Sequence, residues 1–139
     1  MQRKSIRLLS LLIIGKCIRM KLKHLLISGL AMLALDFVYL SAFSKFFNTL
    51  VRSIQGSPIQ FKWIGAALCY VFLIFGLNYF IIDAKKPLMD AFLFGLVIYG
   101  VYETTNYALL DKWSAKAVVL DTLWGGILMA LTTKITYLL

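Results

Sequence analysis

The chain has 139 residues, of which 61% are hydrophobic and only 15% are charged. Water-soluble domains average about 45–50% apolar and about 25% charged residues, so the composition excludes an ordinary soluble domain and predicts an integral membrane protein in contact with the lipid bilayer. Lys and Arg number 15 against 6 Asp and Glu. In so hydrophobic a chain this excess of positive charge indicates contact with anionic lipid headgroups and a preferred orientation in the membrane, and not binding to nucleic acid. Two cysteines and one histidine exclude a disulfide framework and a His/Cys metal cluster.

The segment 1–19 is basic, and its charges flank an apolar run, residues 8–14, that is too short to span a membrane. No small-residue cleavage site follows, as a signal peptide would require. We interpret residues 1–19 either as a basic surface anchor or as an extension placed before a single membrane domain, residues 20–139.

Four later stretches are long and apolar enough to cross a bilayer core about 30 Å thick, which takes roughly 20 helical residues. They are residues 25–43, 63–82, 88–110 and 117–138. They lack the strict alternation of barrel strands, and the short connections between the later ones permit only tight helical hairpins. The sequence therefore predicts an all-α, four-helix transmembrane bundle.

The connection between the first two spans has a pattern of its own. Apolar side chains recur at helical spacing on one face: Phe43, Phe46, Phe47, Leu50, Val51 and Ile54. Gly56-Ser57-Pro58 then predicts a helix end. We expect a short amphipathic helix at the membrane surface, with a water-exposed continuation of the first span as the alternative.

The distribution of Lys and Arg favours cytoplasmic termini. With the N-terminus inside, ten of these residues fall on the inner side and five on the outer side. Counted from residue 20 onward the two sides are equal, so the predicted orientation depends on the basic segment 1–19. The sequence does not indicate which membrane holds the protein.

Three acidic residues lie inside predicted spans: Asp36, Glu103 and Asp121. An ionised side chain at the centre of a spanning helix costs about 2.5–3.5 kcal/mol on insertion scales, so each needs a physical explanation. The first and third spans run in one direction and the fourth in the other, which places all three carboxyls roughly 6–11 Å below the same surface. We therefore predict one acidic cluster between these three spans.

Polar side chains accompany the acids at helical spacing. They are Tyr39 beside Asp36, Trp124 beside Asp121, and Tyr99, Tyr102 and Asn106 on the face of Glu103. Each of them can donate a hydrogen bond to a carboxyl group. Since we expect no Lys or Arg at this depth, at least one acid is expected to hold a proton, or the cluster to hold a cation.

These residues support three hypotheses. The first is a pocket that binds or conducts a proton, cation or small polar solute, with a homo-oligomer expected if a transport path exists. The second is a structural or accessory protein in which the cluster holds helices together, at about 0.6 kcal/mol for each hydrogen bond. The weakest is a lipid-modifying enzyme. Because phosphate-loop, zinc-protease and Ser-His-Asp motifs are missing, we expect no catalytic residue, no bound metal and no cofactor.

The segment from Tyr102 to Leu110 reads Tyr-Glu-Thr-Thr-Asn-Tyr-Ala-Leu-Leu, and Trp113 and the motif Asp121-Thr-Leu-Trp-Gly follow it. This pattern resembles the predicted membrane proteins known as domain of unknown function 2177, which carry Tyr-Asp-Leu-Thr-Asn-x-Ala-Thr-Leu, a Trp and Asp-x-x-Trp-Gly. The resemblance covers about residues 20–135. Glu103 stands where the family usually has Asp, and Tyr39 where it usually has Trp. The resemblance implies a four-helix membrane protein, found in bacteria and large DNA viruses, and implies no activity.

Overall fold

The computed structural model describes residues 2–139, with side chains from residue 6 onward. The described chain is helical throughout, with short connections and no strand. Its elements are α1 (Gln2–Ala42), α2 (Ser44–Gln55), α3 (Trp63–Leu77), the π-helical turn η1 (Asn78–Ile82), α4 (Leu88–Leu109) and α5 (Ala115–Leu138). Four stretches are long and apolar enough to span a membrane, namely residues 6–42, 63–82, 88–109 and 115–138. The predicted all-α fold with four spans is confirmed.

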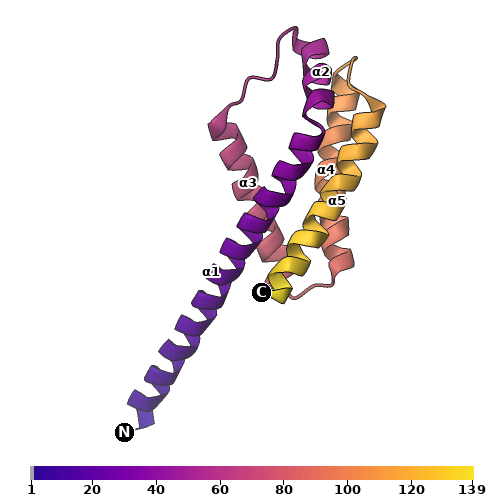
Figure 1. Ribbon diagram of the computed structural model, residues 1–139. Helices are drawn as coiled ribbons and strands as arrows, with labels where there is room; N and C mark the ends of the chain where they lie inside the picture. Colours follow the sequence, from indigo (N-terminus) through magenta and orange to yellow (C-terminus); the bar gives the residue numbers. More distant parts are fainter. Residues whose placement is uncertain (1) are drawn as a thin grey trace.

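Helix α1 is much longer than the first predicted span. It runs without interruption from Gln2 to Ala42, about 60 Å at 1.5 Å per residue, so no break in secondary structure falls at the expected boundary after residue 19. Lys and Arg are good helix formers, and the charges taken as a boundary therefore do not end the helix. Figure 1 shows the N-terminal half of α1 extending well beyond the other helices.

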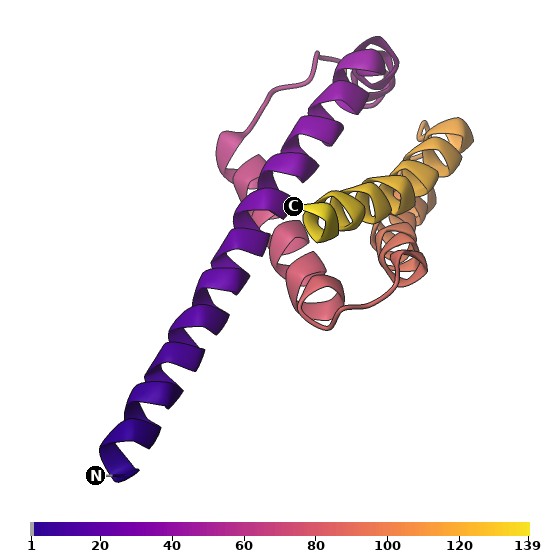
Figure 2. The ribbon, with the colours of Figure 1, turned by 60° about the horizontal axis from the view of Figure 1, so that its bottom comes forward.

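The predicted amphipathic helix is present as α2, a helix separate from α1, so the alternative of a water-exposed continuation of the first span is wrong. A turn at Phe43 separates the two helices, and Figure 2 shows α2 nearly end-on while α1 runs obliquely. The helix ends at Gly56, whose φ of 76° suits a residue without a side chain. The Lys116 ammonium lies 5.5 Å from the centre of the Phe46 ring, which links α2 to the start of α5.

Helices α4 and α5 pack closely through glycines. A Cβ atom at Gly95 would overlap the carbonyl oxygen of Gly125, and one at Gly125 would overlap the Tyr99 ring. Small residues allow this close approach of two backbones, which favours helix association inside a membrane. The α4–α5 hairpin therefore forms one tightly joined half of the bundle, and α5 carries it against α1 (Figure 1).

An apolar layer crosses the middle of the bundle and consists of Met32, Leu73, Leu77, Leu128 and Met129. Along α1, α3 and α5 this layer separates two sets of buried polar residues. The set farther from α2 contains Ser28, Asn78, Thr132, Thr133 and Thr136. The set nearer to α2 contains the three acids.

Candidate functional site

The three acids approach a common level near the end of the bundle that carries α2. Asp36, Glu103 and Asp121 each lie six residues from the nearer end of their helix, about 9 Å along the axis. Asp36 and Glu103 are buried, and Asp121 is half-buried. We call these three residues the acidic cluster.

Asp36 accepts a hydrogen bond at each of its two oxygens. The Trp124 indole Nε1 donates to Oδ1 at 2.9 Å, and the Tyr70 hydroxyl donates to Oδ2. The donors come from α5 and α3, so this one carboxyl joins three helices. Its side chain is 7% exposed, and both oxygens have neutral partners.

Glu103 and Asp121 form a second arrangement, which we call the carboxyl pair. Glu103 Oε2 accepts from the Trp113 indole Nε1 at 2.7 Å, and Asp121 Oδ1 accepts from the Tyr39 hydroxyl at 3.0 Å. The two carboxyls also lie near each other. Glu103 is 1% exposed, so water has little access to its side of the pair.

A stacked aromatic pair stands between Asp36 and the carboxyl pair. The rings of Tyr39 and Trp124 lie 4.4 Å apart with an angle of 6° between their planes. Tyr39 donates to Asp121 while Trp124 donates to Asp36. An indole N–H donates but cannot accept, so it does not form a relay for protons between the two sides.

A cavity of about 300 Å³ adjoins Asp121 between α3 and α4. Cys69 and Leu73 of α3 and Ile98, Tyr99 and Tyr102 of α4 complete its lining. Tyr102 is 58% exposed and Cys69 is also exposed, so these two residues mark the outer rim. The cavity therefore gives Asp121 a lateral opening between α3 and α4.

No basic side chain pairs with these acids in the described part of the chain. The one ion pair found among the side chains from residue 6 onward joins Lys21 and Asp83 at 3.7 Å, at the other end of the bundle. The described residues also contain no group of three or more His, Cys, Asp or Glu suited to a metal ion. The acidic cluster is therefore surrounded by neutral hydrogen-bond donors and apolar groups.

The structure places the eight residues predicted from the sequence in different roles. Five take part in hydrogen bonds of the acidic cluster: Asp36, Tyr39, Glu103, Asp121 and Trp124. Tyr99 and Tyr102 line the cavity. Asn106 is half-buried, and neither it nor these two tyrosines makes a side-chain hydrogen bond within the described residues.

The donors of Asp36 and Asp121 differ from those that spacing suggested. Tyr39 was paired with Asp36 and Trp124 with Asp121, each one turn away on the same helix. Instead the two aromatics are exchanged, and each donates across to the facing helix. A side chain one turn away along a helix points in nearly the same direction as its neighbour, so both reach outward to the partner helix.

Three residues of the site were missed in the sequence. Tyr70 lies at the depth of Asp36 on the second span, and counting depth for tyrosines as well as for acids would have found it. Trp113 resembled an interfacial aromatic, yet the short α4–α5 connection folds it back onto Glu103. Cys69 gave no sequence signal, since a lone cysteine in an apolar span is usually a small apolar side chain.

Comparison with known proteins places the chain in a family but assigns no activity. No curated protein matches the chain. No solved structure matches it either. The family model described as "Predicted membrane protein (DUF2177)" matches residues 21–138, a range that contains the whole acidic cluster and leaves out the first half of α1. The chain therefore belongs to the DUF2177 family of predicted membrane proteins.

Proposed function

We propose that this protein binds a proton, or a small cation in its place, at the carboxyl pair formed by Glu103 and Asp121. The observation that carries the proposal is the burial of Glu103 near Asp121 at a site where no described Lys or Arg neutralises either carboxyl. The pair is held in place by the Trp113 and Tyr39 donors. The carboxyl pair is thus a binding site for positive charge inside the membrane.

Electrostatics favours a shared positive charge at this position. Two unit charges about 4 Å apart repel by about 4 kcal/mol at an effective dielectric constant of 20. A hydrogen bond between two carboxyls also requires a proton on one of them, because ionised carboxylates only accept. A proton shared by Glu103 and Asp121 removes the repulsion and supplies that bond, whereas a cation between them removes the repulsion by contacting both carboxylates.

Access to the carboxyl pair comes from the lateral cavity, on the Asp121 side. The cavity beside Asp121 opens between α3 and α4, whereas the layer containing Met32, Leu77 and Leu128 closes the bundle toward the opposite surface. Binding and release from one side need no change in this layer. Conduction across the membrane would require the layer to open or a path to form between copies in a homo-oligomer.

The test uses the full chain reconstituted in liposomes. The infrared C=O stretch of a protonated carboxylic acid is expected in the wild type and should disappear in Glu103→Gln with Asp121→Asn. Asp111→Asn, which neutralises an exposed loop acid, is the matched control and should keep the band. A wild type without the band, in buffers with and without Na⁺ or K⁺, together with equal stability in all of these salts, would overturn the proposal.

Transport is measured separately with a pH-sensitive dye inside the same liposomes. Proton uptake that is driven by an imposed membrane potential and is lost in Glu103→Gln would show that the protein conducts protons as well as binding them. Uptake equal to that of empty liposomes would limit the protein to binding. The two measurements therefore separate the two forms of the first hypothesis.

A structural role has its own specific support at Asp36. Both oxygens of this residue are occupied by donors from two other helices, which is the arrangement expected of a group that joins helices. If Asp36→Asn and the carboxyl-pair variants lower thermal stability equally, and no variant alters the protonated band, the structural alternative accounts for the whole acidic cluster.

A further inference from the structure

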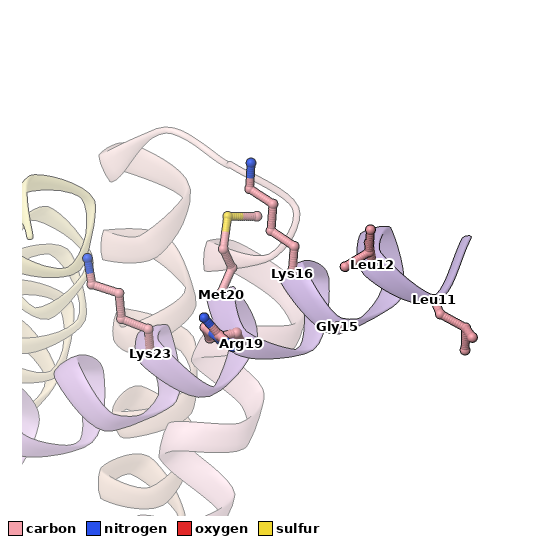
Figure 3. Close-up of a pocket in the computed structure, with 7 residues that line it drawn as sticks. All are labelled: Leu11, Leu12, Gly15, Lys16, Arg19, Met20 and Lys23. Carbon is pink, nitrogen blue, oxygen red and sulfur yellow. The ribbon is translucent and has the colours of Figure 1, made fainter. Parts of the chain in front are cut away.

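Three basic side chains lie on α1 where this helix leaves the bundle. Lys16, Arg19 and Lys23 follow one face of the helix at spacings of three and four residues, and we call them the basic stripe. Figure 3 shows them with the apolar side chains of the same face, Leu11, Leu12 and Met20. Together with Gly15 these residues line a hollow of about 650 Å³.

The Lys23 end of the basic stripe lies beside the bundle. The Lys23 ammonium donates to the carbonyl oxygen of Leu139, so this residue is level with the end of α5. Lys16 lies seven residues earlier, about 10 Å along α1. A headgroup layer is roughly 5–8 Å thick on each side of the hydrocarbon core, so the basic stripe begins where such a layer meets the bundle.

The apolar side chains around the basic stripe are exposed on the surface of α1. Ile6, Leu8, Leu9, Leu11, Leu12, Ile13 and Ile14 are each more than half exposed. Helix α1 crosses the other helices obliquely in both ribbon views, so its N-terminal half leaves the bundle at an angle (Figures 1 and 2). A helix that is apolar and basic along the same stretch is suited to the boundary between headgroups and acyl chains.

Positive charge dominates this end of the molecule. Lys85, Lys86 and Lys134 are exposed here as well, and Asp83 is already paired with Lys21 at 3.7 Å. No acidic side chain forms an ion pair with the basic stripe in the part of the chain with described side chains. Lys16 and Arg19 are therefore available to an anion from outside the chain, and Lys23, which donates one hydrogen bond to Leu139, keeps two further N–H donors.

We propose that the basic stripe binds an anionic phospholipid. Lys16, Arg19 and Lys23 contact the phosphate and the charged headgroup, and Leu11, Leu12 and Met20 contact the apolar part of the lipid. Gly15 leaves the middle of this face open, because no heavy atom lies within 4 Å of the position of a Cβ there. Lys16 and Arg19 precede the residues matched by the family model.

The experiment measures lipid retained by the full chain in native mass spectrometry, with phosphatidylglycerol and phosphatidylcholine as probes. Wild type is expected to retain phosphatidylglycerol preferentially. Each basic residue near an anionic surface contributes about a five-fold factor, so Lys16→Gln with Arg19→Gln and Lys23→Gln should lower this retention about 100-fold. Lys45→Gln with Arg52→Gln and Lys62→Gln removes the same charge at the other end and should have little effect.

Two further variants and competition by inorganic phosphate test the proposal independently. Lys16→Gln with Arg19→Gln leaves the contact between Lys23 and Leu139 intact and should still lower retention about 25-fold. Lys16→Arg with Lys23→Arg keeps the charge and should retain the lipid. Equal losses in the two triple variants, or displacement of the lipid by millimolar inorganic phosphate, would overturn the proposal. Glu103→Gln should not affect retention, since this site is independent of the carboxyl pair.

Discussion

Asp36 and the carboxyl pair lie at the same depth and are separated by one stacked pair of aromatic rings, yet their surroundings differ. Asp36 accepts from neutral donors at both oxygens. Glu103 and Asp121 each have one aromatic donor and lie beside each other. The two sites therefore differ in hydrogen bonding and not in depth. On our proposal, an acid whose oxygens all have neutral donors joins helices, whereas an acid with an oxygen left without one attracts a further positive charge.

The largest effect is expected from Asp36→Leu. This change removes the acceptor shared by Tyr70 and Trp124 and leaves two donors at a buried position without partners, at about 1–3 kcal/mol for each unpaired group. We expect a loss of about 2–5 kcal/mol in the free energy of unfolding, measured in detergent by denaturant titration of tryptophan fluorescence.

Asp36→Asn is the matched control for that change. The amide keeps one acceptor oxygen for one of the two donors, so the loss should fall to about half. If Asp36→Leu is no less stable than Asp36→Asn, the two hydrogen bonds do not hold the helices together, and Asp36 differs from the carboxyl pair less than its geometry indicates.

The stability of the protein should depend much less on the carboxyl pair than on Asp36. In Asp121→Asn the repulsion between two acids is absent, and the amide oxygen still accepts from Tyr39. We expect stability within about 1 kcal/mol of wild type, with either sign, while the protonated-carboxyl infrared band weakens. A loss of stability as large as that of Asp36→Leu would remove the distinction between the two sites.

The sequence predicts the depth of the acids in this site but not their hydrogen-bond partners. The three acids and their common depth follow from helix length alone, because a rise of 1.5 Å per residue converts position into depth. The partners do not follow, because they depend on how helices are rotated about their axes. The exchange of Tyr39 and Trp124, and the approach of Tyr70 from α3, are consequences of that rotation. The fold was easier to predict, since the spans require only length and hydropathy.

The continuous helix α1 was missed for a related reason. A bilayer limits the length of an apolar span but sets no limit on the helix that contains it. Residues 2–24 carry no proline, and their only glycine, Gly15, lies within the helix, so nothing in the local sequence ends α1 before the turn at Phe43.

Two tyrosine variants are expected to lower the free energy of unfolding by an intermediate amount. Tyr39→Phe and Tyr70→Phe each delete one hydroxyl donor while keeping the ring. Hydrogen bonds between membrane helices average about 0.6 kcal/mol, with a maximum near 1.7, so both should lose about 0.6–1.7 kcal/mol in the same denaturant titration. Tyr39→Phe should in addition shift the protonated-carboxyl band, because it donates to Asp121, whereas Tyr70→Phe should leave the band unchanged. A shift in both variants would contradict the separation by the stacked rings.

The smallest effect on stability is expected at the cavity rim, where Cys69→Ala removes a thiol that forms no hydrogen bond in the described structure. Stability should stay within about 0.5 kcal/mol of wild type.

In a Cys17→Ser background Cys69 is the one remaining thiol, and its position in the lining predicts reaction with an apolar maleimide added to liposomes. Asp121→Leu places an apolar side chain at the inner wall of the same cavity and should slow that reaction, whereas Asp111→Leu in the loop should not. If Cys69 reacts at the same rate in both variants, the cavity does not connect the outer rim to Asp121, and the lateral route to the carboxyl pair is contradicted.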